Sequence, residues 1–341
     1  MFLVNGFELL GVAAVVSAEC LNMVGFLFVY FVCAWGCLMT NISCLAIPTI
    51  VICTEPEFEW KSRLLVRSIR KFGGRVKDTY IVSYSPRSGK LPSCACQDEF
   101  DMLNVQMVFE PLNKDFESYG LANKIVALAH AEKTLPFRPL LFLDSDKVIL
   151  REPSVLLGLG GRTFAARPVD VRNCGAADFD SGNGGYWKSI HCACGVSSYR
   201  YVETTIEREV IVEYYNSGMI FASANMKLLG AWLQNFRKVW HSCSRPSCGD
   251  FFVEQSVLAS TVSSLCDNVF ILPDTYNVPI HLYGCFPHSD WRARLSQCVS
   301  VHYHGVFDRG VFLDTLKTFG SMLDADKYDW LTNNLDELSQ P

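Results

Sequence analysis

Short runs of apolar residues alternate along the chain with segments in which apolar residues recur at every third or fourth position. An uninterrupted apolar run predicts a strand buried on both faces, whereas the wider spacing predicts a helix with one buried face. Predicted strands lie at 48–53, 79–83, 105–109, 140–143, 163–167, 213–222, 268–272 and 300–303. Strands that alternate with helices are typical of an α/β fold with a mostly parallel central sheet flanked by helices.

The first predicted unit is a strand at 48–53 followed by a helix that ends at the glycine pair 73–74. Thr54 and Glu57 have the spacing of a capping box, and Pro56 lies in the first turn, where its missing N–H costs no hydrogen bond. Lysine and arginine gather towards the end of this helix, where they complement the helix dipole. We therefore expect the opening strand and helix of a parallel sheet.

Further helices are predicted where apolar residues recur at helical spacing. They begin near Ser118, near Met226, at Asp250 as an N-cap, and near Asp314. Two other stretches are rich in glycine, serine, proline or cysteine and predict irregular loops, at 84–104 and, around the strand at 163–167, at 158–200. A long irregular stretch in a compact domain is usually a functional loop or lid.

Residues 21–39 carry no charge and have nearly the length needed to cross a bilayer. No lysine or arginine precedes Lys61, so the positive-inside rule does not support an orientation with the N-terminus inside. The missing basic region also argues against a cleaved signal peptide. We expect a hydrophobic N-terminal segment at 1–47, with a membrane anchor at 21–39, and one globular domain at 48–341.

The composition indicates a large core and excludes one class of partner. Of the 341 residues, 50% are hydrophobic and 19% are charged. The formal net charge of −5 and the pI of about 5.8 leave no basic surplus for binding nucleic acid. An anionic cofactor would therefore need local cations or a metal ion.

The 15 cysteines do not follow the paired spacing of a tetrahedral zinc site. In an oxidising compartment Cys243 with Cys248, and Cys285 with Cys298, could each close a small loop. The alternative is a set of free, partly buried thiols. The spacing leaves both interpretations open.

Asp144 and Asp146 directly follow the predicted buried strand at 140–143. This places them at the C-terminal end of a strand, where open α/β sheets bind ligands. Two carboxylates so close together raise one another's pKa unless a cation lies between them, and Mg²⁺ or Mn²⁺ prefers such oxygen ligands. The structural alternative is that Asp144 caps the next segment and Asp146 is solvated.

Several segments, in this order, match those of a known family. They are IPTIVICTEP, NKIVAL, LLFLDSDKVIL, YYNSGMIFASAN, VEQSVL, LPDTYN and VHYHG. The sequence between 47 and 306 thereby resembles the GT-A-fold glycosyltransferases, and among them the glycogenin-like family 8 enzymes. The resemblance implies a Rossmann-like GT-A domain that transfers a sugar from a nucleotide-diphosphate donor, a UDP-sugar, to an unknown acceptor. Together with the anchor it implies a single-pass membrane enzyme of the secretory pathway, in the ER or Golgi.

The resemblance also implies a metal site. Asp144 and Asp146 would hold Mn²⁺ or Mg²⁺, and His302 would be the third protein ligand. His304 is the less favoured candidate, although residues two apart on a strand point the same way. Two oxygens and one imidazole suit Mn²⁺ and leave positions for two phosphate oxygens. For either histidine the structural alternative is a hydrogen-bonded core residue.

Further residues match the donor and acceptor positions of the family. The resemblance implies nucleotide-sugar binding by Thr54, Glu55, Lys124, Ser145, Asn216, Ser217 and Gly218. Glu254 and Gln255 match the catalytic acidic-Gln pair, which in family members is usually Asp-Gln. The longer glutamate leaves the acceptor geometry open, and Glu254 could be the base of an inverting enzyme or an acceptor contact in a retaining one. A helix cap, a solvated lysine and an ordinary turn are the structural alternatives for Thr54, Lys124 and the 216–218 segment.

The sequence departs from the family after Gly305, where VFDRGVF replaces the expected G-x-x-K-P-W. The lysine that would neutralise the leaving diphosphate is missing, and Arg309 is the available substitute. Two other functions remain open on the sequence. Asp144 and Asp146 also fit the D-x-D of haloacid-dehalogenase phosphatases, as nucleophile and general acid. A membrane-tethered GT-A module that binds without catalysis is the third hypothesis.

Overall fold

The computed structural model describes residues 47–338, apart from 244, 283–284, 286–289 and 305–308. These residues belong to one compact unit of the chain. The predicted anchor at 21–39 lies outside them. No helix within the described part has both the length and the apolar character needed to cross a bilayer.

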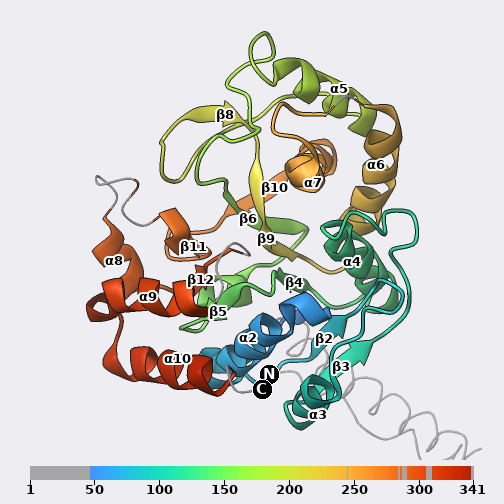
Figure 1. The fold of residues 1–341 in the computed structure, drawn as a ribbon. Helices are drawn as coiled ribbons and strands as arrows, with labels where there is room; N and C mark the ends of the chain where they lie inside the picture. Colours follow the sequence, from blue (N-terminus) through green and yellow to red (C-terminus); the bar gives the residue numbers. More distant parts are fainter. Residues whose placement is uncertain (1–46, 244, 283–284, 286–289, 305–308, 339–341) are drawn as a thin grey trace, which may run out of the picture. The chain divides into compact units, whose positions relative to one another are not determined.

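The centre of the described unit is a mixed sheet with the strand order β10-β6-β9-β4-β1-β2-β3 (Figure 1). Its strands are Thr49–Cys53 (β1), Ile81–Tyr84 (β2), Val105–Val108 (β3), Leu140–Leu143 (β4), Thr163–Pro168 (β6), Tyr215–Ala222 (β9) and Asn268–Ile271 (β10). Neighbouring strands are parallel except for β9, which runs antiparallel to both β4 and β6. This confirms the predicted α/β fold with a mostly parallel sheet.

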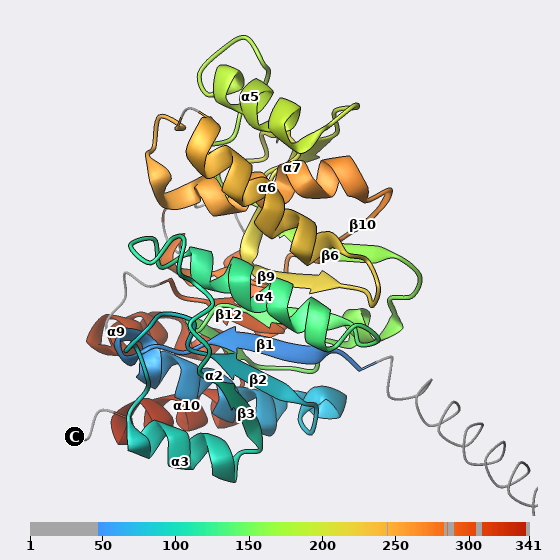
Figure 2. The ribbon, with the colours of Figure 1, turned by 90° about the vertical axis from the view of Figure 1, so that its right-hand side faces the viewer.

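Helices cover both faces of the sheet, as its continuously apolar strands require. In β4, Leu141 and Leu143 enter the core that α2 and α3 cover, while Leu140 and Phe142 enter the core of α4 to α7. Figure 2 shows α4 and α6 on one side of β1 and β2, with α2 and α3 on the other. The helices are Glu59–Phe72 (α2), Cys94–Met102 (α3), Ala122–Thr134 (α4), Gly184–Cys194 (α5), Leu228–Ser242 (α6), Val253–Leu265 (α7), Trp291–Ser296 (α8), Arg309–Phe319 (α9) and Ala325–Glu337 (α10).

Two smaller sheets complete the described fold. One has the order β11-β12-β5, and the other is the antiparallel pair β7-β8. Their strands are Lys147–Ile149 (β5), Tyr201–Glu203 (β7), Val210–Val212 (β8), Val278–Pro279 (β11) and Ser300–His302 (β12). In the first of them β12 pairs antiparallel with β5, so that His302 lies opposite Lys147. This pairing brings a late strand next to the two aspartates that precede β5.

The structure corrects several local predictions. Helix α3 lies in the predicted loop 84–104, and helix α5 lies in the predicted loop 158–200. The capping box is wrong, because Glu55 is the N-cap of a short 3₁₀ turn at Pro56–Phe58 and no side chain caps it. Gly249 replaces Asp250 as the N-cap of the 3₁₀ turn that precedes α7. Cysteine, aspartate and glycine have low intrinsic helix propensity, and tertiary packing outweighs it in α3 and α5.

One disulfide joins Cys174 to Cys248, whose Cα atoms are 6.1 Å apart. The predicted pairs Cys243–Cys248 and Cys285–Cys298 are therefore wrong, and Cys243, Cys285 and Cys298 are free thiols. Spacing along the chain favoured short loops, whereas the folded chain joins segments 74 residues apart. The disulfide connects the loop after β6 with the segment that leads into α7.

Candidate active site

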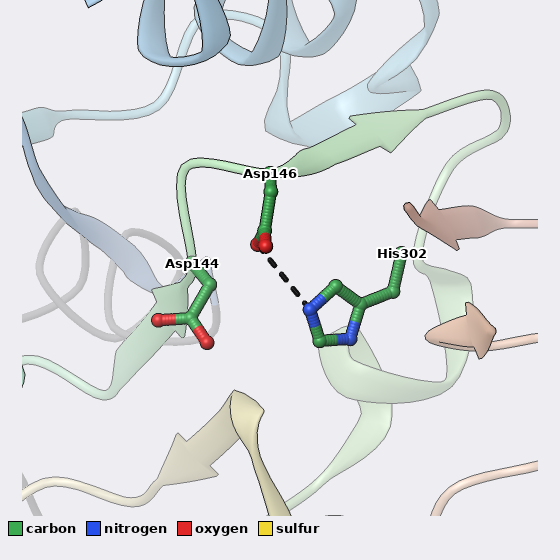
Figure 3. A group of neighbouring side chains, drawn as sticks. All are labelled: Asp144, Asp146 and His302. Atoms are coloured by element: carbon green, nitrogen blue, oxygen red, sulfur yellow. Dashed lines mark ion pairs between the residues drawn. The ribbon is translucent and has the colours of Figure 1, made fainter. Parts of the chain in front are cut away.

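Three side chains from two segments far apart in the sequence converge at the C-terminal end of β4. Asp144 directly follows β4, Asp146 directly precedes β5, and His302 ends β12. One ligand atom from each lies within 4.8 Å of the other two, and Figure 3 shows the three side chains pointing towards a common space. The strand pairing between β5 and β12 thus assembles the site that the sequence predicted.

The electrostatics of this cluster suit a cation. His302 Nε2 lies 3.2 Å from Asp146 Oδ1. Burial opposes ionisation of Asp146, but His302 and Lys147 outweigh it and hold the pKa of Asp146 well below its usual value. Burial, and then the nearby Lys147, lowers the pKa of His302, which favours the neutral imidazole that can bind a metal ion. Two carboxylates and a neutral imidazole fit Mn²⁺ or Mg²⁺, with imidazole favouring Mn²⁺.

Gly218 leaves the space that this cluster occupies. A Cβ at this position would lie 2.8 Å from Asp144 Oδ2 and 3.0 Å from both His302 Cε1 and Lys147 Nζ. The Gly218 amide donates to Asn216 Oδ1 at 2.9 Å, and the Asp144 amide donates to the Gly218 carbonyl at 2.8 Å. The Asn-Ser-Gly segment therefore holds the β4 and β9 backbones together beside the carboxylates.

Lys124, on α4, forms ion pairs with the metal-site residue Asp144 and with Glu254 on α7. Its Nζ lies 3.0 Å from Asp144 Oδ2 and 3.3 Å from Glu254 Oε1. It also donates to Ser217 Oγ at 3.3 Å. Burial opposes the charge on Lys124, but Asp144 and Glu254 outweigh it and raise the lysine pKa above its usual value. Lys124 is therefore a buried cation shared by two acids.

Glu254 and Gln255 lie in the first turn of α7 and both contact Ser217. Ser217 Oγ donates to Glu254 Oε1 at 2.8 Å, and the Ser217 amide donates to Gln255 Oε1 at 3.0 Å. The second oxygen, Glu254 Oε2, has no hydrogen-bond partner among the described residues. Burial is the main cause that raises the pKa of Glu254. Ser217 therefore holds one oxygen of this carboxylate, while the second oxygen is buried and unpaired within the described structure.

All these groups border one cavity of about 460 Å³. Of the residues predicted from the sequence, the cavity is lined by Glu55, Lys124, Asp144, Ser145, Asp146, Asn216, Ser217, Gly218, Glu254, Gln255, His302 and His304. Thr54 does not line it. Its side chain is fully buried and accepts a hydrogen bond from Ser83 Oγ at 2.8 Å.

Two further predicted residues, His304 and Arg309, are not among the three clustered metal ligands. His304 lines the cavity, but the three-residue ligand cluster includes His302 and not His304. Arg309 is the first residue of α9, and its side chain lies outside the described part of the structure. Its predicted contact with the diphosphate stays a prediction.

The structure adds cavity residues that the sequence did not indicate. They are Asp170 and Asn173 after β6, Phe251 and Phe252 before α7, and His281 after β11. Glu55 is held in the wall by Arg87, whose Nε donates to Glu55 Oε1 at 2.8 Å. These residues lie in loops and short turns without periodicity, and no motif marked them.

The fold thus places a D-x-D at the end of β4, a later histidine and a buried carboxylate at one cavity. Residues 49–266 match the family described as the Rhodobacterales glycosyltransferase domain, and the chain belongs to this family. The protein is therefore a glycosyltransferase. This assignment decides against the phosphatase.

One solved glycosyltransferase structure, WbbM, shows the same fold, and two others resemble the chain more distantly. The bifunctional glycosyltransferase WbbM, in its apo form, superposes with a TM-score of 0.52 at 15% identity, over 79% of this chain and 49% of that one. The galactosyltransferase LgtC, in complex with donor and acceptor sugar analogs, gives 0.47 at 14% identity, over 86% and 97%. Apo GlyE of Streptococcus pneumoniae TIGR4 gives 0.47 at 14% identity, over 85% and 62%.

The chain spans about half the length of WbbM. No curated protein matches the sequence.

Proposed function

We propose that this glycosyltransferase is metal-dependent and transfers a sugar from a nucleoside-diphosphate donor, a UDP-sugar, to a hydroxyl group of an acceptor. The observation that carries the proposal is the cluster of Asp144, Asp146 and His302, which borders the same cavity as Lys124 and Glu254. A divalent cation held by this cluster would neutralise the donor diphosphate. The reacting sugar then lies between the metal site and the carboxylate of Glu254.

The reaction breaks the bond between the anomeric carbon and the diphosphate oxygen, which leaves with the bonding electron pair. A bond forms between the anomeric carbon and the acceptor oxygen, and the acceptor hydroxyl loses its proton. Glu254 lines the cavity, and its Oε2 has no hydrogen-bond partner among the described residues. We assign to it either the base that takes this proton or the group that faces the anomeric carbon, and the anomeric configuration of the product distinguishes the two roles.

Lys124 fixes the position of the metal-site carboxylate relative to the carboxylate of Glu254. Because its charge is shared by Asp144 and Glu254, it holds these two carboxylates in place on either side of its ammonium group. Ser217 and Gln255 fix the orientation of the α7 carboxylate relative to β9. Asn216, Gly218 and Ser145 border the remaining wall, where they would contact the donor sugar and phosphates.

The uracil base, Mn²⁺ as the ion and the closer relation to glycogenin-like enzymes rest on the sequence resemblance. The location in the secretory pathway rests on the predicted anchor at 21–39. The disulfide between Cys174 and Cys248 supports an oxidising compartment, because cytosolic proteins seldom keep such bonds. Glu55 would contact the nucleoside from its end of the cavity.

The test is a panel of nucleotide-sugars with Mn²⁺, read as release of nucleoside diphosphate. We expect release with one donor, loss of release with EDTA, and loss in the Asp146→Ala variant. Asp180→Ala is the matched control, since the Asp180 side chain is 90% exposed and is not part of the cavity lining. A wild-type protein that neither binds nor turns over any donor would overturn the proposal.

A further inference from the structure

Three histidines form a continuous group of rings along one wall of the cavity. The rings of His302 and His304 are stacked with centroids 4.0 Å apart, and His281 meets His304 edge to face at 3.8 Å. His304 has a left-handed backbone conformation with φ of 60°. Such a conformation is uncommon for a residue with a side chain, and it persists where the surrounding structure demands it. His304 is therefore held between His281 and the predicted metal ligand His302.

One nitrogen of each of these two rings is left unpaired. His281 Nδ1 and His304 Nε2 are both buried, and neither atom has a hydrogen-bond partner among the described residues. Leaving a buried polar group unpaired costs about 1–3 kcal/mol. Both rings line the cavity. A ligand in the cavity that accepts hydrogen bonds would recover part of this cost.

The charges around the cavity indicate which ligand that is. Carboxylates line it at Glu55, Asp144, Asp146, Asp170 and Glu254. Among the described lining residues Lys124 is the one lysine or arginine, and its charge is engaged by Asp144 and Glu254. A diphosphate bound beside the metal site would meet few positive groups here. Uncharged N–H groups would bind the diphosphate without forming ion pairs with these carboxylates.

We propose that His281 and His304 donate hydrogen bonds to the diphosphate of the donor and of the nucleoside diphosphate product. This inference rests on the proposed function. A neutral imidazole keeps one N–H donor. His304 stacks on the predicted metal ligand His302, and His281 in turn contacts His304, so both rings belong to one group beside the metal site. As the bond to the anomeric carbon breaks, the electron pair moves to the diphosphate oxygen. The two histidines stabilise that oxygen's growing charge without transferring a proton.

The experiment compares two substitutions at His281, which lies outside the metal cluster. His281→Leu removes the donor, and His281→Gln keeps an N–H. Affinities for UDP, GDP and ADP are measured by calorimetry with Mn²⁺, and the nucleoside of whichever diphosphate binds is measured alongside. Binding of Mn²⁺ alone is measured by electron paramagnetic resonance. His241→Leu, at an exposed position on α6, is the control for the substitution itself.

We expect His281→Leu to weaken nucleoside diphosphate binding about tenfold or more, because a hydrogen bond to a charged group is lost. Binding of the nucleoside and of Mn²⁺ should stay within about twofold of wild type, and His281→Gln should recover most of the loss. If His281→Leu binds the diphosphate like wild type, or loses nucleoside and diphosphate affinity equally, the inference is wrong while the proposed function stands. If the wild type binds no nucleoside diphosphate with Mn²⁺, both are overturned.

Discussion

Gly218 and Asp144 are joined by a hydrogen bond of 2.8 Å between the Asp144 amide and the Gly218 carbonyl, and the Asp144 carboxylate occupies the space of a missing Cβ at residue 218. Any side chain here would contact the carboxylate at 2.8 Å and the ring of His302 at 3.0 Å. Strand β9, which carries Gly218 and pairs with β4, therefore limits the geometry of the metal site. This relationship makes a small substitution informative.

We expect Gly218→Ala to lower Mn²⁺ affinity and transfer activity at least about tenfold, because Asp144 must move away from His302. The fold should persist, since a single methyl group costs about 1–3 kcal/mol in a packed site. Mn²⁺ titration and thermal unfolding measure the two effects. Gly185→Ala is the control, because a Cβ there meets nothing within 4 Å. Unchanged metal affinity in Gly218→Ala would show that residue 218 does not limit the site.

Lys124→Met should destabilise the protein by about 3–5 kcal/mol, since it leaves Asp144 and Glu254 without their shared buried cation. Chemical denaturation measures this change. Adding Glu254→Gln removes one of the two uncompensated charges, so the double variant should regain part of the stability but none of the activity. If the double variant is as unstable as Lys124→Met, the coupling between Lys124 and Glu254 is not electrostatic.

Glu254→Gln should lower kcat about 100-fold or more while donor affinity changes little, because the substitution removes the free carboxylate oxygen and keeps the shape. Burial raises the pKa of Glu254 above the ordinary 4.5. The carboxylate is the reactive form, so kcat should fall as the pH decreases, with its acidic limb above pH 4.5. Steady-state kinetics across pH measure this. Retention of full kcat in Glu254→Gln would remove Glu254 from the reaction.

Cys174→Ser should lower the free energy of unfolding by up to about 4 kcal/mol, because the disulfide closes a loop between residues 74 apart. Reduction of the wild type should have the same effect. Cys243→Ser should be neutral by comparison, since Cys243 is a free thiol. Denaturant unfolding with and without dithiothreitol checks both variants. Equal destabilisation in the two variants would contradict the observed pairing.

Stability should decrease as the pH falls from 6.5 towards 4 in a way that depends on His191. This ring is buried, stacks on Tyr199 with centroids 5.4 Å apart, and has no hydrogen-bond partner within the described structure. Burial lowers its pKa from 6.5 to about 4. Between pH 6.5 and about 4 the His191 ring is therefore protonated in the unfolded chain but not in the folded chain. The stability that this group contributes above pH 6.5 is lost as the pH falls through this range.

The loss attributable to His191 is about 3 kcal/mol at most, from the difference between the two pKa values. His191→Phe keeps an aromatic ring and removes the titrating group. We expect its free energy of unfolding to change less between pH 6.5 and 5 than that of the wild type. A variant with the wild-type pH dependence would assign the effect to other groups.

The sequence alone determined the parallel strands and the position of the aspartates. Continuous apolar runs such as 140–143 predict strands buried on both faces, because helices must cover both faces of such a sheet. Asp144 and Asp146 follow that run directly, so their place at the sheet edge is a local property of the chain. The helices at 94–102 and 184–194 were missed, since their residues have low helix propensity and tertiary packing decides.

Only the tertiary structure decided which distant residues complete the site. The resemblance named His302 and Glu254, but the pairing of β12 with β5 and the contacts of Lys124 show how they meet. The Cys174–Cys248 bond and His281 had no signal in the sequence, because each depends on segments far apart along the chain. Local patterns report burial and hydrogen bonding near a residue, whereas convergence in a cavity depends on how all the strands are ordered.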